Sequence, residues 1–174
     1  LRRYTIVSIG TLMRPDELIH LKWSDIDFRS KKILIRDSKT KASRIIDMCP
    51  PVFDCLQKLK LIQTAKWPAC DYVFPNSQGR AASSYTFSLP FRKLIGKIGL
   101  KDFRRYDLRH TGASWIAQSN KSNLFALQEI MGHKTLAMTR RYSHLADRQK
   151  QETINILADA LGGAEIDAAK ERVA

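Results

Sequence analysis

The spacing of apolar residues predicts helices at the start of the chain. Ile6, Ile9 and Met13 lie three or four positions apart, as residues on one face of a helix do. Pro15 predicts the start of a second helix, because proline is favoured at the first helical position and two acidic residues follow it in the first turn. We therefore expect two consecutive helices before residue 22.

The middle of the chain changes from a helical pattern to a strand pattern and back. Two β-branched runs joined by a short polar turn predict a β-hairpin over residues 31–48. A helix opened by prolines is expected over residues 50–66, and small and polar residues predict a loop over 71–88. A basic amphipathic helix is expected over residues 89–100, ended by Gly99.

The last third of the chain is predicted to be helical. We expect Asp107 to cap one helix and Asn123 to cap another, over residues 124–131, which Gly132 ends. A short helix carrying Leu136 and Tyr142 follows, and then a helical tail. The sum is an α+β fold: a mainly helical domain with one small antiparallel sheet.

The composition of the chain indicates what kind of partner it binds. The 174 residues are 44% hydrophobic, which suits one folded domain, and 30 Lys+Arg against 17 Asp+Glu give a formal net charge of +13. Small soluble domains ordinarily carry a net charge of about 2–8 in magnitude. The excess positive charge therefore indicates a polyanionic partner.

The cysteines and the hydropathy pattern bear on location. Three cysteines, with no C-x-x-C pair among them, argue against a disulfide framework and for a reducing interior. No apolar run approaches the roughly 18 residues of a membrane span. The chain opens without Met, so we expect it to be a piece of a longer protein that starts inside a helix.

Two arginines stand where helices are expected to begin. If Asp107 caps its helix, Arg109 and His110 lie in the first turn, where the helix dipole disfavours cations. Arg14 directly precedes the helix that starts at Pro15. A cation at a helix start suggests a bound anion such as phosphate. An ion pair with a nearby carboxylate would also explain Arg109, and an arginine extending from a helix boundary would also explain Arg14.

Four segments carry basic residues, histidine and tyrosine in a fixed order: TLMRPDEL at 11–18, DSKTKASRIIDM at 37–48, YDLRHTGAS at 106–114 and LQEIMGHKTLAMTRRYSH at 127–144. The first, third and fourth resemble T-G-L-R-x-x-E-L, H-D-L-R-H-T-x-A-S and L-G-H-x-x-x-x-x-T-x-x-Y-x-H. The second resembles a hairpin that bears a catalytic lysine. All belong to the tyrosine recombinases, the phage-integrase family, and the resemblance covers nearly the whole chain.

The resemblance implies a role for each matching residue. Tyr142 would attack a DNA phosphodiester, form a 3′-phosphotyrosine and release a 5′-hydroxyl. Arg14 and Arg109 would hold the non-bridging phosphate oxygens, because a planar guanidinium can contact two oxygens at once. Lys39 would protonate the leaving 5′-oxygen, and His133 would donate a hydrogen bond to the phosphate.

The resemblance implies no cofactor and no metal, and the sequence has neither H-E-x-x-H nor G-x-x-x-x-G-K-[ST]. Glu17 matches the carboxylate of the first segment and would orient Arg14 or cap its helix. Tyr106 stands where the family usually has histidine, and it can hydrogen-bond the phosphate but is a worse base. Leu12 replaces the usual glycine, which we expect to change local packing only.

The resemblance also implies an assembly. Residues 1–174 would be the catalytic domain, truncated at its N-terminus, without the N-terminal DNA-binding domain. Its partner would be double-stranded DNA, bound by a homo-tetramer on paired sites when active, in a bacterial or phage protein of the cytoplasm. The tail after Tyr142 would dock either on its own domain or on a neighbouring subunit.

Three functions remain open at this point. The resemblance favours a site-specific recombinase for integration and excision of a prophage or mobile element, although a chromosome-dimer resolvase would show the same motifs. A DNA-binding regulator that lost catalysis is the second reading, favoured by Tyr106 alone. A type IB topoisomerase shares the chemistry and is the third.

Overall fold

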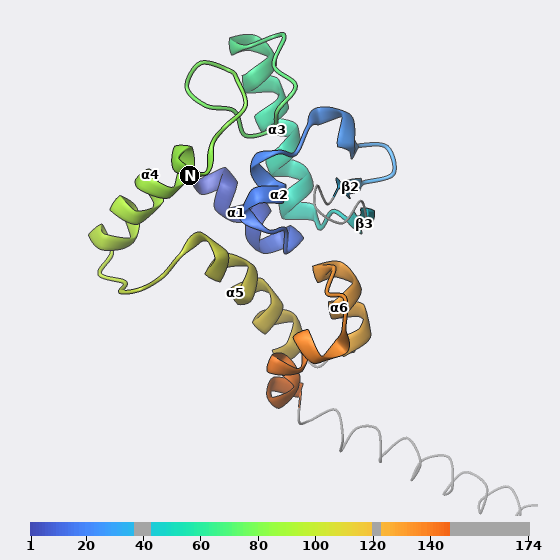
Figure 1. Cartoon of the computed structure of the whole chain (residues 1–174). Helices are drawn as coiled ribbons and strands as arrows, with labels where there is room; N and C mark the ends of the chain where they lie inside the picture. Colours follow the sequence, from blue (N-terminus) through green and yellow to red (C-terminus); the bar gives the residue numbers. More distant parts are fainter. Residues whose placement is uncertain (37–42, 120–122, 147–174) are drawn as a thin grey trace, which may run out of the picture.

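The computed structural model describes residues 1–36, 43–119 and 123–146, with backbone alone at 144–146. These residues form a mainly helical domain with one three-stranded antiparallel sheet, which confirms the predicted fold class (Figure 1). In chain order the elements are α1 (Arg2–Thr11), α2 (Pro15–Ile19), η1 (Trp23–Asp25), β1 (Ile26–Asp27), β2 (Lys32–Arg36), β3 (Ser43–Asp47), α3 (Pro50–Lys66), α4 (Ser84–Lys97), α5 (Arg105–Gln118), α6 (Leu124–Met131), η2 (Leu136–Met138) and η3 (Arg140–Ala146), where η denotes a 3₁₀ helix.

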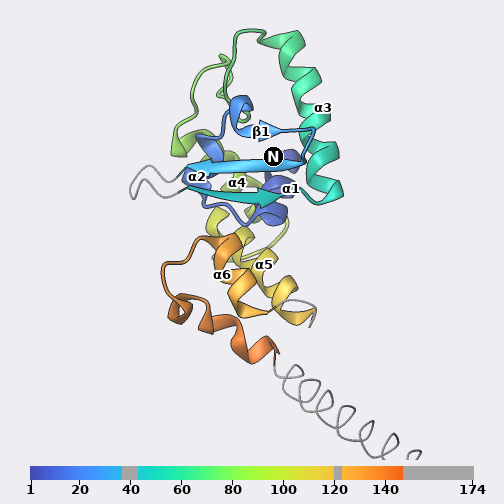
Figure 2. The ribbon, with the colours of Figure 1, turned by 90° about the vertical axis from the view of Figure 1, so that its right-hand side faces the viewer.

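The predicted hairpin is the pair β2 and β3, with Ile33 opposite Ile46. Ile33, Ile35 and Ile46 point into the core, as the alternation of apolar residues requires. The sheet also contains β1, which the sequence pattern did not reveal, so the strand order is β1-β2-β3. Figure 2 shows β3 as the strand on the side of α6.

Helix α1 packs against both α3 and α5, and Gly112 permits the close approach of α5. A Cβ atom at residue 112 would collide with the Ile9 carbonyl oxygen and the Leu12 side chain. Helix α1 ends at Thr11 because Leu12 adopts a left-handed conformation with φ 53°. Met13, which the spacing placed on this helix, therefore lies beyond its end, but it is buried in the same core as Tyr4 and Val7 of α1.

Two helix starts differ from the prediction. Helix α4 begins at Ser84, inside the expected loop, so that Pro90 lies within the helix. Helix α5 begins at Arg105, and Asp107 is its third residue instead of its cap. The Asp107 carboxylate reaches back to accept the backbone N–H of Arg104 at 2.6 Å, which is how an acidic residue in the first turn closes a helix start.

A second, smaller core lies between α5, α6 and η3. Its buried members are Leu12, Ala113, Ala117, Leu127, Met131 and Tyr142. This core holds η3 against the side of α5, as Figure 1 also shows. Tyr142, the residue of greatest chemical interest in the sequence, is therefore also a packing residue.

Within the described ranges, no helix has both the length and the apolar character to cross a membrane.

Candidate active site

Arg14 lies at the junction of α1 and α2 and points toward the end of α6. It is the N-cap of α2, with Pro15 in the first helical position as predicted. Its Nη1 donates to Glu17 Oε1 at 2.8 Å, and its Nη2 donates to the Gly132 carbonyl at 3.2 Å. Glu17 also accepts the Arg14 backbone N–H at 2.7 Å, so this carboxylate both orients the guanidinium and caps the helix.

Arg44 is a residue of this cluster that sequence reasoning missed. From β3 its Nη1 and Nη2 each donate to one oxygen of Glu17 at 2.8 Å, and its Nε donates to the Ile130 carbonyl at 2.9 Å. A usable signal was present: the two-residue repeat of a strand places Arg44 on the same face as buried Ile46. An arginine on the inward face of a strand needs an acidic partner.

The two arginines determine the ionisation of Glu17. Burial alone would raise its pKa, but hydrogen bonds and charge from Arg44, and then from Arg14, outweigh burial and hold the pKa below its ordinary value. Glu17 is therefore ionised at neutral pH. The single negative charge of Glu17 faces the two positive charges of Arg14 and Arg44, so these three groups together carry a net positive charge.

Arg109 is the third guanidinium and is 0% exposed. Its Nη1 donates to the Leu12 carbonyl, and its Nη2 donates to the Met131 carbonyl at 2.6 Å. Its Nε is buried without a hydrogen-bond partner in the structure. Burial, reinforced by the charge of Arg14, lowers the pKa of Arg109 to about 10, so it remains a cation at neutral pH.

The helix-start argument for Arg109 is wrong, because the residue lies in the second turn of α5. Burial provides a stronger reason to expect an anion here. A buried cation is costly unless a counter-ion pairs with it, and neutral carbonyls satisfy only part of the guanidinium. With Arg14 and Arg44 nearby, a single carboxylate leaves the cluster short of negative charge.

His133 follows Gly132, the left-handed C-cap of α6, at the corner where the chain turns toward η2. Its Nδ1 lies 2.9 Å from Oγ1 of Thr139, which is fully buried. Burial lowers the pKa of His133 to about 4, and the charges of Arg109 and Arg14 act in the same direction. The imidazole is therefore neutral at pH 7 and held by one nitrogen, with the other free of the Thr139 contact.

Tyr142 lies in η3, and its hydroxyl oxygen is 2.5 Å from Nδ1 of His110 on α5. Only 3% of Tyr142 is exposed. Burial raises the pKa of the Tyr142 hydroxyl, although Arg141 and Arg109 act against it. The hydroxyl is therefore protonated at neutral pH and in contact with a possible proton acceptor.

Tyr106, at the position of the family histidine, is on the same face of α5 one turn before His110. Its ring packs edge-on against the imidazole of His110, with centroids 5.0 Å apart and planes at 62°. Its side chain is more open than that of Tyr142, with 38% of the residue exposed. The contact to the Tyr142 hydroxyl comes from His110 and not from the residue in the family position.

Lys39 lies outside the described residues. The strands on either side of it are described, and Arg36 pairs with Ser43 in their register. Arg14, Arg109, His133 and Tyr142 come together from four separate segments around the C-terminal end of α6. No group of three potential metal-ligating side chains occurs in the parts of the chain that the structure describes.

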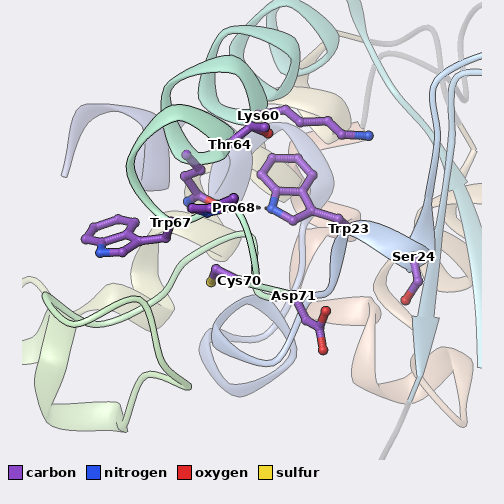
Figure 3. A pocket seen from close by; sticks show the side chains of 9 residues that line it. Trp23, Ser24, Lys60, Thr64, Trp67, Pro68, Cys70 and Asp71 are labelled. Carbon is purple, nitrogen blue, oxygen red and sulfur yellow. Dashed lines mark hydrogen bonds between the residues drawn. The ribbon is translucent and has the colours of Figure 1, made fainter.

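A small pocket lies elsewhere, between α3 and η1 (Figure 3). Its volume is about 220 Å³, and Trp23, Lys60, Thr64 and Trp67 are among its lining residues. The Trp23 indole N–H donates to the Gln63 side chain at 3.0 Å, which ties η1 to α3. None of the predicted site residues lines this pocket, so it is separate from the arginine cluster.

Comparisons with known proteins identify the family of this chain. The sequence model described as "Phage integrase family" matches residues 1–149. The integrase of Salmonella phage P22 is 28% identical over 155 residues, which cover 83% of this chain and 39% of the relative. Tyrosine recombinase XerC of Xanthomonas axonopodis pv. citri (strain 306) is 30% identical over 134 residues, which cover 76% and 43%. The chain thus spans less than half the length of these two relatives.

Solved structures share the fold. XerA recombinase matches with a TM-score of 0.70 and 26% identity, over 88% of this chain and 61% of XerA. The catalytic domain of bacteriophage HP1 integrase matches with a TM-score of 0.62 and 25% identity, over 88% and 79%. XerH site-specific recombinase, solved bound to its difH substrate, matches with a TM-score of 0.71 and 25% identity, over 90% and 46%.

The fold is that of tyrosine recombinase catalytic domains, and the arginine cluster lies where α1, α5 and α6 meet. The chain belongs to the phage integrase family.

Proposed function

We propose that this domain cleaves and rejoins DNA strands through a 3′-phosphotyrosine at Tyr142. The activity would serve site-specific integration or excision of a prophage or mobile element. The observation that carries the proposal is the meeting of buried Arg109 with Arg14, His133 and Tyr142 in a cluster that is short of negative charge. A backbone phosphate of DNA supplies that charge, and the net charge of +13 favours DNA as the source.

The reaction assigns one task to each group. The Tyr142 oxygen attacks the phosphorus, and the bond to the 5′-oxygen breaks. Arg14 and Arg109 stabilise the negative charge that develops on the non-bridging oxygens, and removal of one such donor typically costs about 10²–10³ in rate. Neutral His133 donates a hydrogen bond from Nε2, and Lys39 protonates the leaving oxygen.

DNA binding must open the site before this reaction occurs. Arg109 is 0% exposed and Tyr142 is 3% exposed, so neither reaches a phosphate in the arrangement described. Tyr142 sits in a 3₁₀ helix after a short connection, and this segment can shift with less loss of packing than α5. We expect a small shift of η3 along α5 when DNA binds, one that exposes the Tyr142 hydroxyl to the phosphate while Tyr142 stays beside α5.

The test is covalent capture on a nicked DNA duplex that carries the sequence flanking the protein's own gene. In such a duplex the short 5′-hydroxyl fragment diffuses away after cleavage, and the protein remains attached. Full-length protein should give a denaturation-resistant adduct whose modified peptide contains Tyr142, in the presence of EDTA as well as without it.

The matched variants are Tyr142→Phe and Tyr85→Phe. Each deletes one hydroxyl, but Tyr85 is 81% exposed and lies on α4, a helix that contributes no residue to the arginine cluster. The adduct should vanish in Tyr142→Phe and persist in Tyr85→Phe, with DNA binding retained in both. Binding without any adduct in the wild type would support a non-catalytic regulator instead. Relaxation of plasmid that lacks a specific site would support a topoisomerase.

A further inference from the structure

The hydroxyl of Tyr142 and Nδ1 of His110 are 2.5 Å apart, across the packed surface of α5 and η3. The two residues are 32 positions apart in the chain, so this contact is a product of the fold. It joins the atom proposed to attack phosphorus to a nitrogen that can bind a proton. A contact of this length between nucleophile and base is the geometry that proton transfer requires.

The other two candidates for the same task point elsewhere. His133 directs its Nδ1 to Thr139 Oγ1 at 2.9 Å, which fixes that nitrogen in a structural hydrogen bond. Tyr106 packs its ring against the imidazole of His110, so it supports that ring from the side. Tyr106, which stands where the family usually has histidine, therefore packs against a different histidine, His110, one turn later on α5.

We propose that His110 is the base that removes the proton of Tyr142 during strand cleavage, a role that rests on the function proposed above. The Tyr142 O–H bond breaks and a bond forms between that proton and Nδ1 of His110. The tyrosine oxygen bonds to phosphorus, and the 5′-oxygen leaves with a proton from Lys39. On rejoining, the 5′-hydroxyl attacks and the His110 imidazolium returns its proton to the departing Tyr142 oxygen.

The surroundings of His110 keep it available as a base. Burial lowers its pKa below 6.5, and Arg141, Arg109 and Arg104 act in the same direction, whereas Asp107 raises it. The imidazole is therefore neutral at pH 7 and can accept a proton. Among the side chains that the structure describes, Tyr106, Tyr142 and His133 are further titratable groups around it. A bound phosphate adds negative charge nearby, which stabilises the imidazolium that forms.

His110→Asn is the sharpest variant, because the asparagine side chain keeps a hydrogen-bonding atom near the place of Nδ1 but does not take up a proton. His20→Asn is the matched control: His20 is exposed, and its Nδ1 contacts the Asp16 carbonyl of its own helix at 2.7 Å. The measurement is single-turnover cleavage of the nicked duplex by full-length protein between pH 5 and 9, with DNA binding measured in parallel.

We expect His110→Asn to bind DNA normally and to cleave about 10²–10⁴-fold more slowly, the usual contribution of a general base. The wild-type rate should rise with pH through the pKa of His110 and then level off, and this rise should disappear in the variant. His20→Asn should match the wild type. Added imidazole should accelerate His110→Ala more than the wild type, because a small base can enter the vacated space.

Cleavage by His110→Asn at the wild-type rate and with the same pH profile would show that the contact is structural only. Faster cleavage would show that His110 restrains Tyr142, which also overturns the proposal. In both cases the adduct at Tyr142 survives, so the proposed function stands. Absence of the adduct in the wild type and in His20→Asn would overturn the proposed function, and the role of His110 with it.

Discussion

Arg44 of β3 and Glu17 of α2 form a two-bond ion pair, with each terminal nitrogen of the guanidinium 2.8 Å from a different carboxylate oxygen. The side chains are 14% and 8% exposed, so the pair is largely shielded from water. Because Glu17 also holds Arg14, the pair connects β3 to a guanidinium of the candidate active site.

Replacement of Arg44 by lysine should disturb both stability and the site. Lysine keeps the charge but cannot make the two parallel hydrogen bonds, so we expect unfolding free energy to fall by about 1–3 kcal/mol. Strand cleavage should also slow, because Glu17 is then held less firmly and positions Arg14 less well. Urea denaturation and single-turnover cleavage measure the two effects. Arg29→Lys, the same change at an exposed turn, should alter neither.

Leu12 combines a buried side chain, 2% exposed, with a left-handed backbone. We predict that Leu12→Ala loses about 2–5 kcal/mol of stability through lost packing. Leu12→Gly should lose about 1 kcal/mol less, because glycine adopts the left-handed conformation without strain. At Leu108, buried inside α5, the order should reverse, with glycine worse than alanine by about 1 kcal/mol. Thermal or urea unfolding of the four variants tests this, and the same order at both positions would contradict it.

Tyr106 should affect the rate of cleavage but not its pH dependence. We propose that its hydroxyl contacts the phosphate, so Tyr106→Phe should slow cleavage by about 10²-fold and leave DNA binding intact. Because the ring remains against His110, the pH at which the rate rises should stay in place. Tyr106→His should be tolerated and should add a second ionisation. If Tyr106→Phe matches the wild type at every pH, the residue is only a packing partner.

His133 should make the fold sensitive to acid. Its pKa is about 4 in the folded chain and about 6.5 when unfolded, so between these values the unfolded chain binds the proton and the folded chain does not. Stability should therefore fall as the pH drops from 6.5 toward 4. His133→Gln should lose less stability than the wild type between pH 7.5 and 5.0 in urea titrations. Equal losses in both proteins would mean that His133 titrates normally.

Elements with strong local signals could be predicted from the sequence. Helix α3 begins at Pro50, and α6 lies between Asn123 and Gly132, as proline, asparagine and glycine indicate. Elements that depend on distant partners could not be predicted. Strand β1 has two residues and exists because it pairs with β2, and α4 extends through a segment whose small residues favour a loop.

The site divides in the same way. Arg14, Arg109, His133 and Tyr142 were found through motifs, and the structure brings them together. Strand alternation marks Arg44 as inward-facing and the fourth motif contains Thr139, but local patterns do not encode their partners, Glu17 on another segment and His133 around a corner. His110 was visible in the sequence, but its contact with Tyr142 depends on how η3 packs against α5. The helix-start argument failed because it placed the N-cap of α5 at Asp107, three residues after the observed N-cap, Arg104.

The hydrogen bonds of Arg109 have a consequence for sequence divergence. Its two terminal nitrogens are held by the main-chain carbonyls of Leu12 and Met131, not by side chains. Every amino acid carries this carbonyl, so a mutation at either position leaves the acceptor in place as long as the backbone keeps its course. The guanidinium can thus keep its position when the side chains at these two positions change. The same two backbone acceptors can hold the arginine in chains that share few residues around it.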